Sequence, residues 1–268
     1  MSQKGSGSTL TATGTVYLVG AGPGAPDLLT LRAARLLAEA GIVFHDALVH
    51  PETVALAVNA EKIAVGKRCG KHSTAQQFIN KRLVDAARRH RVVVRLKGGD
   101  PMLFGRAQEE IAALEAAGIA CEVVPGITAA LAAAAELKTS LTQRGFARSV
   151  TFATPRVGSD ELASAWADGL AVSDAGAIYM GVGEARAIAA TLLCAGKLAG
   201  LPVAVVENAS LPDVRIRYTT LHELPLLADA AIRGPALILL GPQFHARAAR
   251  ARPDCADRCR SAPREATG

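Results

Sequence analysis

Short apolar runs alternate with longer segments of helical spacing along the first 125 residues. The runs are rich in β-branched residues and are bounded by glycine, proline or polar residues, a pattern typical of buried strands. The segments between them carry apolar residues three and four positions apart, which indicates amphipathic helices. We expect strands at residues 16–19, 42–44, 62–65, 92–96 and 120–124, and helices at 28–40, 74–89 and 108–117. This order predicts a mostly parallel sheet with right-handed crossovers.

A second series follows the Pro125-Gly126 pair. We expect an alanine-rich helix at 127–137, strands at 149–153, 177–180, 202–206 and 236–240, a helix at 184–194, and a further short strand opening at 218–220. The predicted fold is therefore α/β, with two α/β lobes and a ligand in the cleft between them. The expected organisation is a flexible N-terminus (1–14), an N-terminal lobe (15–126), a C-terminal lobe (127–245) and a disordered tail (246–268).

Two glycine-rich loops follow expected strands, at residues 20–26 and 98–101. Ligands of open α/β sheets bind just beyond the carboxyl ends of strands, and glycine lets a ligand approach the backbone closely. A dinucleotide fingerprint is an alternative for the first loop, but Pro23 and Pro26 remove N–H groups that a pyrophosphate requires. Either loop alone could be a tight turn without a ligand. Together they favour a small-molecule site.

Composition and charge narrow the function classes. The net charge of +6 invites a nucleic-acid role, but residues 246–268 supply half of it, with six arginines against three acidic residues. Aromatic residues for base stacking make up only 4% of the chain. No apolar run approaches the ~20 residues that span a bilayer. The five cysteines are scattered without C-x-x-C spacing and the histidines lack ligand spacing, so we expect a cytoplasmic protein without a metal.

The ordered set of motifs resembles one family, the uroporphyrinogen-III C-methyltransferases among the S-adenosylmethionine-dependent tetrapyrrole methyltransferases. The matching segments lie at residues 18–24, 45–49, 65–68, 70–73, 95–101, 104–106, 109–110, 124–129, 141–142, 144–145 and 179–181. They run through nearly the whole folded region. The chain departs from the family pattern at several positions, among them Ala25, Gln143 and Arg156.

The resemblance implies an enzyme with the methyl donor S-adenosyl-L-methionine in a cleft between two α/β lobes, acting as a homodimer. It implies methylation of uroporphyrinogen III at C2 and C7 to precorrin-2, the precursor of sirohaem, cobalamin and haem d1. No dehydrogenase or chelatase domain is expected, and no metal, nucleic acid or membrane partner. Two alternatives stay open: a methyltransferase acting on a later precorrin, and a non-catalytic nucleotide-binding module.

The resemblance also assigns site residues. The implied methyl-donor contacts are Pro23, Gly98, Gly99, Asp100, Leu103, Thr128, Ala129, Met180, Ala209 and Ala236. The implied substrate-facing residues are Arg106, Glu109, Arg144 and Met180. Asp100 can accept from a ribose hydroxyl or an ammonium, or it can cap a turn. Met180 can form an apolar wall, or it can fill the core.

Arg106 and Asp46 are the expected catalytic residues. An arginine stays protonated and is a poor base, so we expect Arg106 to bind and to act electrostatically on a carboxylate-rich substrate. Asp46, which follows an expected strand, is the rival group for moving a proton or holding pyrrole N–H groups. Arg144 is expected to bind substrate carboxylates, with a solvated surface charge as the alternative.

Overall fold

The computed structural model describes residues 13–65, 74–157, 164–227 and 232–251. Internal contacts divide the chain into two compact units, Met1–Ala132 with Ser210–Pro212, and Ala133–Ala209 with Asp213–Gly268. The division falls inside helix α5 (Ala129–Glu136) rather than after residue 126. It also assigns a short piece of the second half of the sequence to the first unit.

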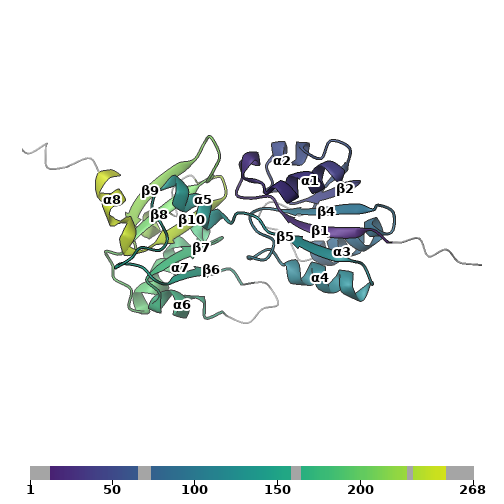
Figure 1. Cartoon of the computed structure of the whole chain (residues 1–268). Helices are drawn as coiled ribbons and strands as arrows, with labels where there is room; N and C mark the ends of the chain where they lie inside the picture. The colour runs from purple at the N-terminus through teal and green to yellow at the C-terminus, as the bar shows by residue number, and fades with distance from the viewer. Residues whose placement is uncertain (1–12, 66–73, 158–163, 228–231, 252–268) are drawn as a thin grey trace, which may run out of the picture. The chain divides into compact units, whose positions relative to one another are not determined.

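The first unit contains a five-stranded sheet in the order β3-β2-β4-β1-β5 (Figure 1). Its strands are β1 (Thr15–Gly20), β2 (Ile42–His45), β3 (Glu61–Ala64), β4 (Val92–Lys97) and β5 (Cys121–Val124). Every neighbouring pair is parallel. The parallel sheet predicted from the first βαβ series is therefore confirmed.

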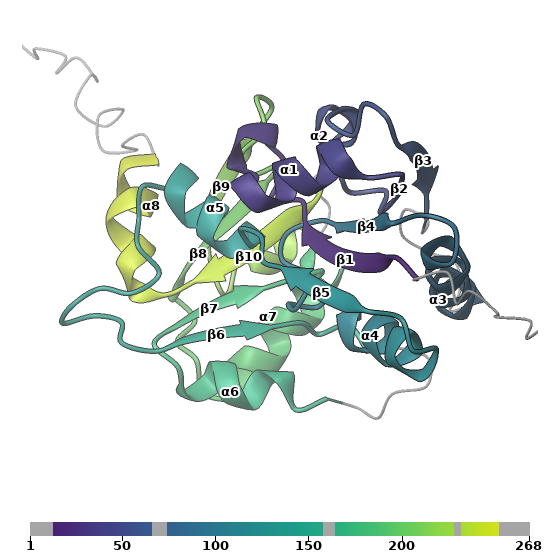
Figure 2. The same ribbon diagram turned by 45° about the vertical axis from the view of Figure 1, so that its right-hand side comes forward.

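Helices cover both faces of this sheet (Figure 2). α1 (Leu31–Glu39) and α2 (Pro51–Ala55) pack on one face, against side chains such as Val19 and Val94. α3 (Thr74–Ala87) and α4 (Ala107–Ala116) pack on the other, against side chains such as Leu18 and Val93. Successive strand residues point to opposite faces, so the continuous apolar runs of β1 and β4 serve two cores at once.

The second unit contains a sheet in the order β6-β7-β10-β8-β9. Its strands are β6 (Val150–Ala153), β7 (Ala175–Ile178), β8 (Pro202–Glu207), β9 (Arg215–Thr220) and β10 (Ala236–Leu240). β6 and β7 are parallel, whereas β10 runs antiparallel to both β7 and β8, and β9 runs antiparallel to β8. This sheet is thus mixed, because β8 and β9 are joined by a short connection that reverses the chain and needs no crossover helix.

Helices α6 (Trp166–Val172) and α7 (Ala185–Cys194) bury their apolar residues against one face of the second sheet. Helix α8 (His245–Ala251) contacts β8 and β9. Short 3-10 turns lie at Pro26–Leu28, Val182–Glu184, Leu224–Leu227 and Pro242–Phe244. None of the helices within the described ranges is long and apolar enough to cross a membrane.

Several sequence predictions need correction. The helix expected from residue 28 begins at Leu31, because Pro26 starts a 3-10 turn and the Thr30 hydroxyl accepts from Ala33 N–H as the cap. Residues 218–220 end strand β9 and do not open it. Residues 246–251, expected in a disordered tail, belong to α8, whose alanine and arginine residues favour a helix. Residues 1–12 and 252–268 lie outside the described residues.

Candidate functional site

The two glycine loops meet through main-chain hydrogen bonds. Gly99 N–H donates to the carbonyl oxygen of Gly22 at 2.7 Å, and Gly22 N–H donates to that of Gly99 at 3.2 Å. The loops follow β1 and β4, which are neighbours in register, with Gly20 opposite Lys97. The two loops, which together favoured a small-molecule site in the sequence, therefore lie side by side at one edge of the sheet.

This edge is a topological switch point of the first sheet. After β1 the chain enters α1 on one face, and after β4 it enters α4 on the opposite face. The two connections therefore diverge just beyond the carboxyl ends of neighbouring strands. Such a divergence is where ligands of open α/β sheets bind.

A third backbone segment joins this edge at Gly126, just after β5. A Cβ on Gly20 would lie 2.6 Å from Gly126 Cα and 2.8 Å from the Gly99 carbonyl oxygen, so glycine is required at this crossing. Asp100 fixes the arrangement, because its Oδ2 accepts from Gly126 N–H at 2.9 Å and its Oδ1 accepts from Met102 N–H at 2.8 Å. Asp100 is therefore a turn-capping residue, although each carboxylate oxygen keeps a lone pair for a ligand.

Space for a ligand lies beside the second glycine pair. A Cβ on Gly98 would meet only Leu48 Cβ, at 3.6 Å, among the described atoms within 4 Å. Gly99 has a φ of +68°, and the nearest described atom to its added Cβ is Thr128 Cα at 4.0 Å. Thr128 is buried, and the other expected donor contacts in this unit (Pro23, Leu103 and Ala129) are half-buried. The structure thus brings backbone segments from both loops and the start of α5 to one edge.

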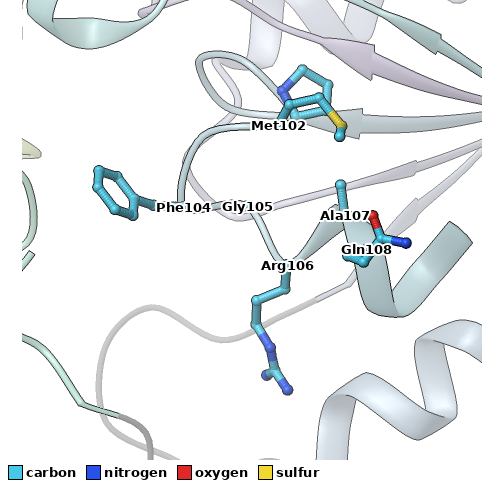
Figure 3. A pocket seen from close by; sticks show the side chains of 7 residues that line it. Met102, Phe104, Gly105, Arg106, Ala107 and Gln108 are labelled. Carbon is cyan, nitrogen blue, oxygen red and sulfur yellow. The ribbon is translucent and has the colours of Figure 1, made fainter. Parts of the chain in front are cut away.

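The loop from β4 to α4 lines a pocket of about 290 Å³ (Figure 3). The lining residues are Pro101, Met102, Phe104, Gly105, Arg106, Ala107 and Gln108. Phe104 and Arg106 both adopt the left-handed conformation, with φ of 53° and 55°. Such conformations in residues other than glycine cost energy and cluster at functional sites. Figure 3 shows the Phe104 ring and the Arg106 guanidinium projecting from this loop in different directions.

Arg106 forms a two-pronged ion pair with Glu109 on the first turn of α4. Arg106 Nε donates to Oε1 at 2.6 Å and Nη2 donates to Oε2 at 2.8 Å. Both side chains are about half exposed, at 53% and 47%. The pair therefore holds the guanidinium in place where an incoming carboxylate can reach it.

A buried ionic cluster lies beneath the same helix. Glu110 is fully buried and accepts from Arg95 Nε at 2.9 Å and from Lys97 Nζ at 3.0 Å. Gln76 on α3 adds a third hydrogen bond to this carboxylate, at 3.2 Å. Arg95 and Lys97 alternate with Val94 and Leu96 along β4, so both cations point to the face covered by α3 and α4.

The cluster shifts the ionisation of its members. Burial disfavours the charged form of Glu110, but Arg95 and Lys97 outweigh it and lower the pKa of that carboxyl. Burial, with the neighbouring charge of Arg95, lowers the pKa of Lys97. Burial alone would lower the pKa of Arg95, but Asp46 and Glu110 together raise it. Sequence reasoning missed this cluster, although charged residues inside a buried strand were its visible signal.

Asp46 connects the buried cluster to the sheet edge. It follows β2, and its N–H donates to the Leu96 carbonyl oxygen at 3.2 Å. Its Oδ1 accepts a short hydrogen bond from Arg95 Nη2, and its side chain is 31% exposed. The two expected catalytic residues are thus both connected to α4. Arg106 pairs directly with Glu109, and Asp46 pairs with Arg95, which in turn pairs with Glu110.

The remaining expected residues belong to the second unit. Met180 follows β7, Ala236 begins β10, and Ala209 follows β8; the strand registers bring all three to one edge of the second sheet. Met180 is 46% exposed with a φ of 55°, which excludes the alternative that it fills the core. Arg144 is exposed, in a turn closed by the Gln143–Ala147 bridge. Among described residues, no three His, Cys, Asp or Glu side chains gather as metal ligands.

Comparisons with known proteins point in one direction. The family model for tetrapyrrole (corrin/porphyrin) methylases matches residues 15–225. The chain is 43% identical over 237 residues to a siroheme synthase of Pseudomonas fluorescens, covering 88% of this chain and 51% of that protein. It is 46% identical over 230 residues to a siroheme synthase of Chromobacterium violaceum, covering 85% and 49%. The chain therefore spans about half the length of these relatives.

Solved structures give the same result. Uroporphyrin-III C-methyl transferase from Thermus thermophilus, complexed with S-adenyl homocysteine, is 40% identical with a TM-score of 0.77. That match covers 87% of this chain and all of the other, at 100%. A cobalt precorrin-4 methyltransferase of cobalamin biosynthesis is 30% identical with a TM-score of 0.74, covering 85% of this chain and 94% of the other.

Proposed function

Because the chain belongs to the tetrapyrrole (corrin/porphyrin) methylases, we propose that it methylates uroporphyrinogen III at C2 and C7, consuming two S-adenosylmethionine molecules and producing precorrin-2. The observation that carries this proposal is the junction of the two glycine loops at the carboxyl edge of the first sheet. The similarity to a uroporphyrin-III C-methyl transferase with bound S-adenyl homocysteine supports it. A later precorrin is the second candidate substrate, because the chain is also similar to a cobalt precorrin-4 methyltransferase.

The residues at the glycine loops fit a nucleoside-bearing methyl donor. When bound, S-adenosylmethionine supplies a methyl group on a sulfonium. The backbone at Gly98 and Gly99, free of Cβ atoms, would lie against the ligand, and the spare lone pairs of Asp100 would accept from a ribose hydroxyl or the ammonium. We propose further contacts with the methyl donor from the residues that the family resemblance implies: Pro23, Leu103, Thr128, Ala129, Met180, Ala209 and Ala236.

The charged groups near α4 fit a carboxylate-rich substrate. The Arg106 fork, already oriented by Glu109, would bind a substrate carboxylate, with Arg144 as a second cation and Met180 as an apolar contact. Asp46 would accept pyrrole N–H groups, or the proton that the positively charged tetrapyrrole loses after the methyl group has moved from sulfur to the ring carbon. Catalysis would then rest on in-line placement of the donor methyl and the acceptor carbon.

The proposal extends to the setting of the enzyme. A homodimer in the cytoplasm would feed precorrin-2 into sirohaem, cobalamin or haem d1 synthesis. The names of the relatives favour sirohaem among these products. Size-exclusion chromatography with light scattering tests the dimer directly.

Incubation of the protein with uroporphyrinogen III and S-adenosylmethionine tests the reaction. The expected result is the precorrin-2 chromophore with two methyl groups transferred per tetrapyrrole. A parallel reaction offers precorrin-2 as the acceptor. Methyl transfer to precorrin-2 without transfer to uroporphyrinogen III would favour a later precorrin as the substrate. Transfer to neither compound would contradict both candidate functions.

A further inference from the structure

Each nitrogen of the Arg95 guanidinium donates to an acceptor within the protein, and the three acceptors come from different places in the fold. Its Nε donates to Glu110 on α4, its Nη1 donates to the Leu96 carbonyl oxygen at 3.3 Å, and its Nη2 donates to Asp46 after β2. The side chain is only 3% exposed. A planar fork bound at every nitrogen has one orientation, unlike a flexible ammonium group.

Asp46 is bound on one side only. Its Oδ1 accepts from Arg95, whereas Oδ2 accepts no hydrogen bond from any residue that the structure describes. The side chain is 31% exposed, so a ligand can reach this carboxylate. A carboxylate held through one oxygen presents the other in a fixed direction, and such preorganisation is what acceptors of catalytic protons or ligand N–H groups require.

The charges of the cluster balance. Arg95 and Lys97 supply two positive charges, and Glu110 and Asp46 supply two negative charges. Glu110 is also held by Gln76, and the neighbouring Asn80 donates to the Glu109 carbonyl oxygen at 3.2 Å. Glu110, which holds Arg95, is therefore bound to residues of both α3 and α4. This network fixes Arg95 more firmly than an exposed ion pair would.

From these contacts we infer that Arg95 is a positioning residue: it fixes the Asp46 carboxylate so that Oδ2 faces an N–H group of the tetrapyrrole. This inference rests on the proposed function. Arg95 itself is kept from the substrate by burial, because its side chain is 3% exposed and each of its three nitrogens donates within the protein. Its contribution to turnover must therefore pass through Asp46.

A double-mutant cycle of Arg95→Gln and Asp46→Asn tests this dependence, with kcat and KM for uroporphyrinogen III as the readout. In the native background, Arg95→Gln is expected to lower kcat by about a hundredfold, the lower range for loss of a placed acid–base group. In the Asp46→Asn background, the same change is expected to alter kcat by less than about twofold. Equal losses in both backgrounds would contradict the inference and indicate a purely structural role.

Two control variants separate the positioning role of Arg95 from misfolding and from the loss of any arginine. Arg95→Lys preserves the charge balance of the cluster but cannot bridge Asp46 and Glu110, so it replaces Arg95→Gln in the cycle if that variant fails to bind S-adenosylhomocysteine. Arg88→Gln removes an exposed arginine paired with Asp85 on α3 and is expected to leave both kinetic constants unchanged. If the native protein itself transfers no methyl group to uroporphyrinogen III, the proposed function fails. If it does, and Arg95→Lys keeps full kcat, the positioning role fails alone.

Discussion

Gly22 and Gly99 exchange a pair of main-chain hydrogen bonds, at 2.7 and 3.2 Å, although 76 residues separate them in the sequence. The exchange joins the loop after β1 to the loop after β4. Gly20, at the start of the first loop, has no room for a Cβ because the segments after β1, β4 and β5 cross there. The same absence of Cβ atoms leaves the backbone at Gly98 and Gly99 accessible to a ligand.

Gly99→Val is expected to abolish binding of S-adenosylhomocysteine. The new side chain would fill the space beside the loop, where the nearest described atom to an added Cβ is 4.0 Å away. It would also force a β-branched residue to a φ of +68°, at a cost of about 1–2 kcal/mol in the free energy of unfolding. Isothermal titration measures the loss of binding and chemical denaturation measures the strain.

Gly118 offers a matched control for the strain. It has a φ of +67° and no described atom within 4 Å of an added Cβ, and it follows α4 in the turn to β5. Gly118→Val is expected to cost the same free energy of unfolding while S-adenosylhomocysteine still binds. Equal weakening of binding by both substitutions would show that the pocket is not beside Gly99.

Arg106→Ala is expected to lower kcat/KM for uroporphyrinogen III by at least about tenfold, because a charge-assisted fork to a substrate carboxylate is lost. Affinity for S-adenosylhomocysteine should stay within about twofold, since the two ligands use different parts of the edge. Steady-state kinetics and titration test the two halves of this prediction. Arg88→Ala removes another exposed i,i+3 arginine–carboxylate pair, Arg88–Asp85, and should change neither quantity.

Glu110→Gln is expected to lower the free energy of unfolding by about 3–5 kcal/mol, because it leaves Arg95 and Lys97 as buried cations with too little negative charge beside them. Glu109→Gln changes the next residue of the same helix, but its pair with Arg106 is half exposed, so the expected loss is below about 1 kcal/mol. Urea denaturation of both variants provides the comparison. A smaller effect at Glu110 than at Glu109 would contradict the importance of the buried cluster.

The contribution of Glu110 to stability is expected to depend on pH. The pKa of this carboxyl is lower in the folded protein than its usual value of 4.5, because Arg95 and Lys97 outweigh the effect of burial. As the pH falls below about 4.5, Glu110 therefore takes up a proton in the unfolded chain before it does so in the folded protein. The stabilisation that the Glu110 carboxylate gives to the fold is lost progressively as the pH drops toward its pKa in the folded protein. The gap in unfolding free energy between the native protein and Glu110→Gln should be full at neutral pH and should narrow below pH 4.5. If the difference in unfolding free energy grew as the pH fell, the lowered pKa of Glu110 would be contradicted.

The sequence was sufficient for the strands and the parallel direction of the first sheet and for its glycine loops, but not for the strand order β3-β2-β4-β1-β5. Local signals decide both, since β-branched runs mark the strands and glycine–proline clusters mark where they stop. The strand order of the second sheet could not be predicted from the sequence, because the position of β10 between β7 and β8 depends on packing between strands far apart in sequence. Residues 218–220 end β9 and do not open it, because the strand begins at Arg215, where charged residues on both sides of Ile216 weaken the apolar signal.

The buried cluster shows a different limit. Arg95 and Lys97 stand out as charges in an apolar strand, but nothing near them in sequence identifies Glu110 as their common partner. The pairing depends on how α4 packs across β4. Asp100 illustrates the converse, since its turn-capping role was foreseen as an alternative, and the structure shows both carboxylate oxygens bound to main-chain N–H groups.

The most direct test of the central claim, that the joined glycine loops hold a sulfur-bearing nucleoside, is isothermal titration of the protein with S-adenosylhomocysteine, NAD and GTP in separate experiments. We predict saturable binding of S-adenosylhomocysteine with one site per chain and no heat from the other two ligands. Binding of NAD alone, or no binding of S-adenosylhomocysteine by a folded protein, would contradict the claim.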